Sequence, residues 1–123
     1  MSASRGVEVT QHADVVVARL EGDIDLANTP TVSVTVLQSV PNDALGLVVD
    51  LSDVRYIDSV GIRMLFTFVR SLHAARQGMA IALPAGSPVR KLLKVTHLDE
   101  AAVFRDSVEE ATLALREGGA PQY

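Results

Sequence analysis

The segment that most constrains the fold is an almost continuous apolar run, ALGLVVDLS, at residues 44–52. A short run rich in Val and Leu predicts a β-strand that is covered on both faces. From Ser59 onward, apolar residues recur at intervals of three and four, which predicts one stripe of an amphipathic helix. The members of this stripe are Val60, Met64, Leu65, Phe68, Val69 and Leu72. A buried strand followed by such a helix indicates an α/β layered fold.

Three other segments have strand patterns. Residues 7–22, VEVTQHADVVVARLEG, predict two short strands around a turn near Ala13, with Gly22 ending the second strand. Residues 79–84, MAIALP, predict another buried strand, and residues 101–105, AAVFR, predict a short last one.

Capping residues mark the limits of the helices. The helix that starts at Ser59 is expected to stop at Gly78. Residues 87–95 begin with a Ser cap and a Pro, which predicts a short helix. Ser107 and Glu110 have the spacing of a capping box, which predicts a last helix behind them.

Residues 31–40, TVSVTVLQSV, give conflicting signals. Alternation of Val with Thr and Ser predicts a strand. Asn28 or Thr29 in front can cap a helix, and Pro30 suits the first helical position, where its missing N–H is not needed. The local pattern leaves both structures open.

The composition limits the class of protein. A length of 123 residues and 48% hydrophobic content fit one compact domain. The absence of Cys excludes disulfides and thiolate sites, and the scattered positions of His12, His73 and His97 predict no metal site. The sequence contains no phosphate-binding loop motif, so we expect no cofactor. It shows neither a signal peptide nor a transmembrane run, so we expect a cytoplasmic protein with no membrane contact.

The charge is unevenly distributed along the chain. Residues 1–58 have a net charge of -6, residues 60–98 contain six bases and no acid, and residues 99–123 have a net charge of -4. Six bases in an acidic protein with few aromatic residues are a weak signal for nucleic acid. They suit the solvated faces of helices better, so we expect no direct nucleic acid binding.

Ser59, within IDSVG at residues 57–61, is the candidate reactive side chain. The hydrolase nucleophile elbow, G-x-S-x-G, has a glycine where Ile57 stands here. The usual order of Ser, acid and His also fails, because residues 60–98 contain no Asp or Glu. The sequence therefore predicts that the chain is not an enzyme. By local rules Ser59 is a helix cap, a role that Asp58 could fill equally well.

The segment LVVDLSDVRYIDSVGIRML at residues 47–65 resembles the signature of the STAS domain, as found in anti-sigma factor antagonists. The matching positions are Asp50, Leu51, Ser52, Val54, Ile57, Asp58, Ser59, Gly61, Ile62 and Leu65. Residues 20–30, LEGDIDLANTP, and residues 87–111 are similar to flanking regions of the same family. The likeness covers residues 7–116, so residues 1–6 and 117–123 are expected to be flexible ends. Val60 departs from the family, where many members have Ser or Thr.

This resemblance implies a single STAS-type α/β domain, with a mixed sheet of four or five strands and helices packed mainly on one side. It favours a helix for residues 29–40, TPTVSVTVLQSV. It also implies a partner-switching regulator, which in its unphosphorylated form binds an anti-sigma factor of the serine/threonine kinase type and frees the sigma factor. The kinase would phosphorylate Ser59 with its own ATP, and a PP2C-type phosphatase would reverse the modification.

The resemblance places the start of the first helix beside the Ser59 turn on one surface. The partner-binding residues expected there are Asp23, Asp25, Asn28, Thr29, Asp58, Val60, Gly61 and Ile62. Gly61 is expected to allow close approach of a partner's backbone, whereas Ile62 could instead belong to the core. Two alternatives are a STAS subunit of another assembly, such as a stress-sensing scaffold or a lipid transporter, and a small-molecule sensor.

Overall fold

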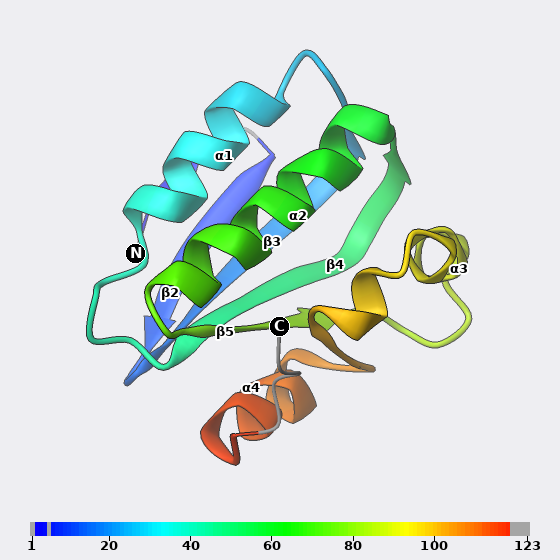
Figure 1. The fold of residues 1–123 in the computed structure, drawn as a ribbon. Coiled ribbons are helices and arrows are strands. Elements are labelled where there is room, and N and C mark those ends of the chain that lie inside the picture. The colour runs from blue at the N-terminus through cyan, green and yellow to red at the C-terminus, as the bar shows by residue number, and fades with distance from the viewer. Residues whose placement is uncertain (1, 5, 119–123) are drawn as a thin grey trace.

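The structure is a computed structural model that describes residues 2–4 and 6–118 of the 123-residue chain. Its centre is one β-sheet of six strands, which follow one another in the sheet in sequence order (Figure 1). The strands are β1 (Ser2–Ser4), β2 (Val7–His12), β3 (Val15–Ile24), β4 (Gly46–Ile57), β5 (Gly78–Ala82) and β6 (Val103–Arg105). The helices are α1 (Thr29–Gln38), α2 (Ser59–Ala74), α3 (Pro88–Val95), the 3-10 helix η1 (Leu98–Glu100) and α4 (Val108–Arg116).

The sheet is mixed, which confirms the predicted α/β fold class. Strands β1, β2 and β3 are antiparallel neighbours, whereas β3, β4, β5 and β6 run parallel. The sheet has one strand more than the four or five predicted, because residues 2–4, in the expected flexible N-terminal segment, pair with β2. Residues 1, 5 and 119–123, which also belong to the expected flexible ends, lie outside the described residues.

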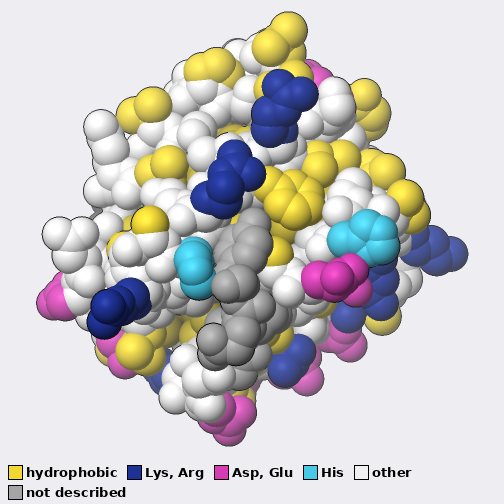
Figure 2. Space-filling view, in the orientation of Figure 1, with side chains coloured by type: hydrophobic (Ala, Val, Ile, Leu, Met, Phe, Trp, Pro, Cys, Tyr) yellow, Lys and Arg dark blue, Asp and Glu magenta, His cyan; other side chains and the backbone are white. Residues whose placement is uncertain are grey.

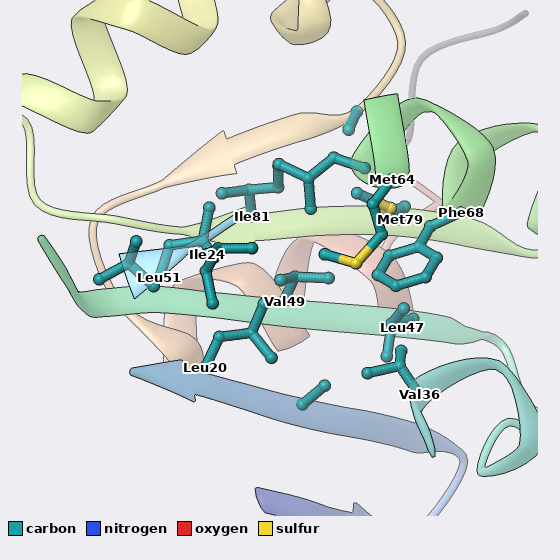
Figure 3. Close-up of a cluster of buried hydrophobic side chains, with 14 of the residues drawn as sticks. Leu20, Ile24, Val36, Leu47, Val49, Leu51, Met64, Phe68, Met79 and Ile81 are labelled. Carbon is teal, nitrogen blue, oxygen red and sulfur yellow. The ribbon is translucent and has the colours of Figure 1, made fainter. Parts of the chain in front are cut away.

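The helices cover the two faces of the sheet unequally (Figure 1). Helices α1, α2 and α3 pack on one face, and α4 packs on the other, so the prediction of helices mainly on one side is confirmed. Strand β4 is buried on both faces, as its apolar run predicted. Its Leu47, Val49 and Leu51 belong to the cluster beneath α2, shown in Figure 3, and its Val48 belongs to the cluster beneath α4.

The ambiguous segment after Pro30 is a helix, α1. Val32 and Val36, one turn apart, are fully buried against the sheet, whereas Val34 between them is 54% exposed. In a strand these three alternate residues would share one face. Burial of Val32 and Val36, which are four residues apart, therefore overrides the strand preference of the β-branched side chains.

Strand β3 continues past Gly22, where the sequence predicted its end. Gly22 has a φ of 76°, a left-handed conformation that glycine adopts readily, and the pairing of β3 with β4 shifts register there. Beyond this irregularity the strand runs on to Ile24, which pairs with Ile57 at the end of β4. The two segments that follow, the loop before α1 and the start of α2, therefore leave the sheet side by side.

Helix α2 ends at Ala74, before the predicted stop at Gly78. Arg76 takes the left-handed conformation, with a φ of 60°, and Gly78 is instead the first residue of β5. A Cβ on the paired Gly46 would lie 2.2 Å from the carbonyl oxygen of Gly78. The glycine pair therefore lets β4 and β5 start in close contact.

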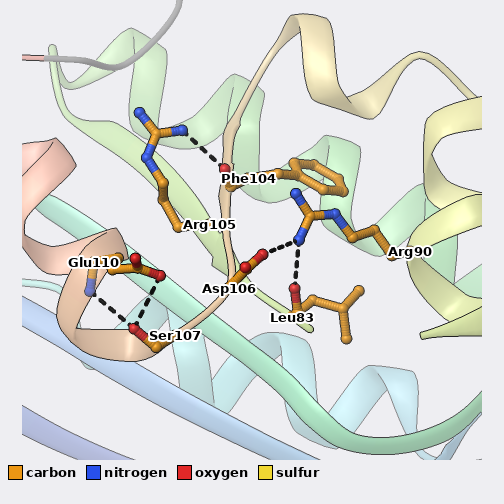
Figure 4. A network of polar contacts seen from close by, with 7 residues as sticks. All are labelled: Leu83, Arg90, Phe104, Arg105, Asp106, Ser107 and Glu110. Carbon is orange, nitrogen blue, oxygen red and sulfur yellow. Dashed lines mark hydrogen bonds and ion pairs between the residues drawn. The ribbon is translucent and has the colours of Figure 1, made fainter. Parts of the chain in front are cut away.

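Arg90 of α3 connects the end of β5 with the segment between β6 and α4 (Figure 4). Its guanidinium donates to the carbonyl oxygen of Leu83 and to the carboxylate of Asp106, both at 2.7 Å, and lies 5.9 Å from the centre of the Phe104 ring. Next to Asp106, Ser107 accepts a hydrogen bond of 3.1 Å from the N–H of Glu110, which confirms the capping signal predicted for α4. Within the described part of the chain, no helix is long and apolar enough to cross a membrane.

Candidate functional site

Ser59 is the first residue of α2, separated by one residue from the end of β4, and its side chain is exposed. The residue that caps the helix is Asp58: it has an extended conformation, and its Oδ1 accepts a hydrogen bond of 2.8 Å from the N–H of Gly61. The local rules had left Ser59 and Asp58 as equal candidates, and the structure decides for Asp58. Consequently the Ser59 hydroxyl is not engaged in capping.

Asp58 also holds the loop that precedes α1. Its Oδ2 accepts a hydrogen bond of 3.2 Å from the N–H of Leu26, and its own N–H donates to the carbonyl oxygen of Ile24 at 3.1 Å. One carboxylate therefore bridges two segments that are 32 residues apart in the sequence. This bridge fixes the loop at residues 25–28 beside Ser59.

The polar side chains of this loop shape its backbone. Asn28 accepts a hydrogen bond of 3.0 Å from the N–H of Asp25 and donates one of 2.6 Å to the carbonyl oxygen of Asp23. Asp25 accepts a hydrogen bond of 3.0 Å from the N–H of Ala27. Asn28 is at the capping position of α1, but its side chain makes no capping hydrogen bond, so the predicted cap is wrong in this respect. Its contacts are made within the loop.

Three of the expected partner-binding residues contribute mainly to the interior. Thr29 is only 5% exposed, Gly61 is buried, and Ile62 is half-buried against the core cluster. A Cβ on Gly61 would lie 2.6 Å from Cγ1 of Ile57 and 3.0 Å from the carbonyl oxygen of Ile24. Close packing within the chain therefore requires a glycine here, in addition to any role in the approach of a partner.

Leu26 is the surface residue that sequence reasoning missed. Its side chain is 69% exposed, although its N–H is held by Asp58 next to Ser59. The signal was present in the sequence, since Leu26 is an apolar residue inside a polar loop. We call Leu26, Asp58, Ser59 and Val60 the Ser59 face.

A shallow groove is lined by part of the same loop and by charged residues of β3 and β4. Both arginines of the groove have acidic partners: Arg19 forms an ion pair with Asp53, and Arg55 lies 3.9 Å from Asp23. The hydrogen bonds that the Arg19 guanidinium donates to the Asp53 carboxylate raise the pKa of Arg19, so this guanidinium stays charged. In residues 2–4 and 6–118, no three His, Asp or Glu side chains are grouped so that they could hold a metal ion.

The assignment of the cap to Asp58 gives a first prediction. We expect Asp58→Ala to lower the free energy of unfolding by about 1–2 kcal/mol, because it removes the cap and the hydrogen bond to the loop. Ser59→Ala is the matched control and should change it by less than about 0.5 kcal/mol. Urea denaturation of both variants measures the difference, and an equal loss in the two would contradict the assignment.

Comparison with known proteins places these features in a family. The family model described as the STAS domain matches residues 6–111. The anti-sigma-F factor antagonist RsfB of Mycobacterium tuberculosis is 27% identical over 120 residues, which cover 96% of this chain and 97% of RsfB.

Two solved structures show the same fold. An anti-sigma factor antagonist from Mycobacterium paratuberculosis has a TM-score of 0.79 at 24% identity, covering 89% of this chain and 92% of that protein. The Bacillus cell fate determinant SpoIIAA, in its phosphorylated form, has a TM-score of 0.66 at 20% identity, covering 89% and 99%. The resemblance noted in residues 47–65 is thus confirmed along almost the whole chain, and the chain belongs to the STAS domain family.

Proposed function

We propose that this protein is an anti-sigma factor antagonist that works by partner switching. Its unphosphorylated form binds an anti-sigma factor of the serine/threonine kinase type and thereby frees a sigma factor in the cytoplasm. The observation that carries this proposal is the exposed Ser59 hydroxyl, which sits at the start of α2 with its capping role taken by Asp58. The names of the relatives support the same class of function.

Phosphorylation of Ser59 is the proposed switch. The Oγ atom attacks the γ-phosphorus of ATP held by the kinase, the bond from that phosphorus to the bridging oxygen breaks, and ADP and a proton are released. The chain itself is the substrate in this step, so ATP and Mg²⁺ belong to the partner. A PP2C-type phosphatase hydrolyses the phosphoserine and restores the hydroxyl.

The modification acts at the interface more than on the fold. A phosphate adds about -1.5 to -2 charges to the Ser59 face at neutral pH. The start of a helix tolerates negative charge, so we expect the chain to stay folded. A partner surface that fits a small hydroxyl would have to desolvate and accommodate a bulky dianion, and it would therefore release the modified protein.

Leu26 supplies the apolar part of the proposed contact. Exposed apolar side chains that a partner can bury provide much of the binding energy of an interface. By contrast, Asp25 and Asn28 use their side chains to hold the loop, so we propose that they position Leu26 and contribute little direct contact. Val60, half-buried next to Ser59, extends the same apolar surface.

The decisive experiment combines binding with modification. The kinase-type anti-sigma factors of the source organism are purified, and each is incubated with this protein, first without and then with ATP. We expect one of them to bind without ATP, and mass spectrometry to locate a phosphate on Ser59 after ATP is added. If none binds or phosphorylates the chain, the proposed function is wrong.

The contribution of Leu26 is tested with the same partner. Leu26→Asp should weaken binding at least tenfold, because a carboxylate cannot replace the buried aliphatic contact. The matched control is Val95→Asp at the end of α3, where the side chain is 75% exposed and does not belong to the Ser59 face. If the Leu26 variant and the wild type bind with equal affinity, Leu26 does not belong to the interface.

A further inference from the structure

Arg63 lies one helical turn after Ser59, on the exposed side of α2. Side chains four residues apart on a helix are neighbours. Arg70 lies on the same side of the helix, but at about 1.5 Å per residue it is roughly 16 Å farther along the axis than Ser59. In the orientation of Figure 1, Figure 2 shows dark-blue Arg and Lys side chains over α2.

No acidic side chain of the described residues is paired with Arg63. Helix α2 contains no Asp or Glu, and the Arg63 guanidinium makes no ion pair within residues 2–4 and 6–118. Several other arginines of the chain do pair with carboxylates, namely Arg19, Arg55, Arg90 and Arg116. Arg63 is therefore a positive charge without a counter-ion beside the proposed modification site.

A phosphate on Ser59 would need such a charge. The adjacent Asp58 carboxylate is held in place by the N–H groups of Gly61 and Leu26, at 2.8 and 3.2 Å. It would repel the phosphate, and it already occupies the Gly61 N–H, which would otherwise be a donor for phosphate oxygens. A cation one turn away offsets this repulsion.

We propose that Arg63 is the built-in counter-ion of phosphorylated Ser59, closing over the phosphate across one turn of α2. The inference rests on the proposed phosphorylation of Ser59. The planar fork of guanidinium N–H groups matches the oxygens of a phosphate, and an anion followed by a cation four residues later is the favourable order in a helix. In the unmodified protein Arg63 remains solvated, so it acts only on the phosphorylated state.

This pairing stabilises the modified form of the protein. It lowers the second pKa of the phosphate, which is about 6 without a partner, so that the group carries both negative charges at neutral pH. It also directs the phosphate along the surface of α2, from Ser59 towards Arg63. Arg63 is thus a positioning residue for the switched-off state.

The test uses protein in which phosphoserine is incorporated at position 59 during translation, so no kinase is needed. Titration of the phosphate is followed by ³¹P NMR at low ionic strength in the Arg63→Gln, Arg63→Lys and Arg70→Gln variants. We expect Arg63→Gln to raise the phosphate pKa by about 0.3 units, as for an exposed helical ion pair. Arg63→Lys should keep most of the effect, and Arg70→Gln should leave the pKa unchanged.

Salt provides a second check, since the difference between wild type and Arg63→Gln should shrink in about 0.5 M NaCl. A pKa within about 0.1 units of wild type in Arg63→Gln, or an equal shift in Arg70→Gln, would overturn the pairing. The titration and the kinase experiment test different proposals. If no kinase modifies Ser59, the proposed function is wrong, but the titration still measures the pairing with Arg63. Conversely, if a kinase modifies Ser59 but the phosphate pKa does not shift in Arg63→Gln, the proposed function stands and only the pairing with Arg63 is wrong.

Discussion

Ser59→Ala should bind the anti-sigma kinase equally well before and after incubation with ATP, whereas the wild-type protein should lose about 100-fold in affinity when it is phosphorylated. The substitution removes the atom that we propose accepts the phosphoryl group and changes little else, because the hydroxyl is exposed and makes no capping hydrogen bond. In cells the Ala variant should keep the sigma factor active. Isothermal titration with the purified kinase, with and without ATP, measures both affinities.

Ser59→Asp is the charged counterpart of this variant. It places a carboxylate next to that of Asp58 and should bind more weakly than Ser59→Ala, though less weakly than the doubly charged phosphoprotein. The Asp58→Ala variant is not a suitable control here, since it also releases the loop that carries Leu26. If wild type, Ser59→Ala and Ser59→Asp bind equally in all conditions, the switch does not operate through Ser59.

Gly61→Val should lower the free energy of unfolding by about 3 kcal/mol, the upper end of the usual effect of overpacking a core. Already the Cβ atom would lie 2.6 Å from Ile57 and 3.0 Å from the backbone oxygen of Ile24. Ile57 is only 2% exposed, so it has little room to move. Thermal unfolding followed by circular dichroism should show a decrease of roughly 12 °C for a chain of this length.

Gly86→Val is the matched control for this substitution. An added Cβ at Gly86 meets no atom within 4 Å, so the midpoint should change by less than roughly 2 °C. The comparison separates the two interpretations of Gly61. If Gly61→Val were as stable as Gly86→Val and lost only partner binding, the glycine would serve the approach of the partner's backbone.

The elements of the fold could be predicted where one segment contains its own signal. The buried strand β4 and the amphipathic helix α2 follow from apolar periodicity, and the cap of α4 follows from two residues of one turn. Such features depend on contacts between residues close in sequence, or on a hydrophobic face that any partner layer can cover. These features can therefore be predicted without knowing which segment packs against them.

Other features depended on contacts between distant segments. The valines of α1 alternate as in a strand, and only the sheet beneath them, which buries Val32 and Val36 together, decides for a helix. The predicted end of β3 at Gly22 was wrong, because the strand continues to Ile24 through an irregularity in its pairing with β4. The predicted end of α2 at Gly78 was also wrong, because Arg76 adopts the left-handed conformation that was expected of the glycine.

Patterns within single segments were enough to predict the layers of the domain, its core and the position of Ser59 at a strand-to-helix turn. The construction of that turn depends on packing between segments: Asp58 caps the helix and holds Leu26, Gly61 fits against Ile24 and Ile57, and Thr29 is buried. Asp58 and Gly61 each contact both their own turn and the segment at residues 24–26, which lies more than 30 residues earlier in the sequence. Periodicity and capping rules describe one segment at a time, and they cannot express a contact of this kind.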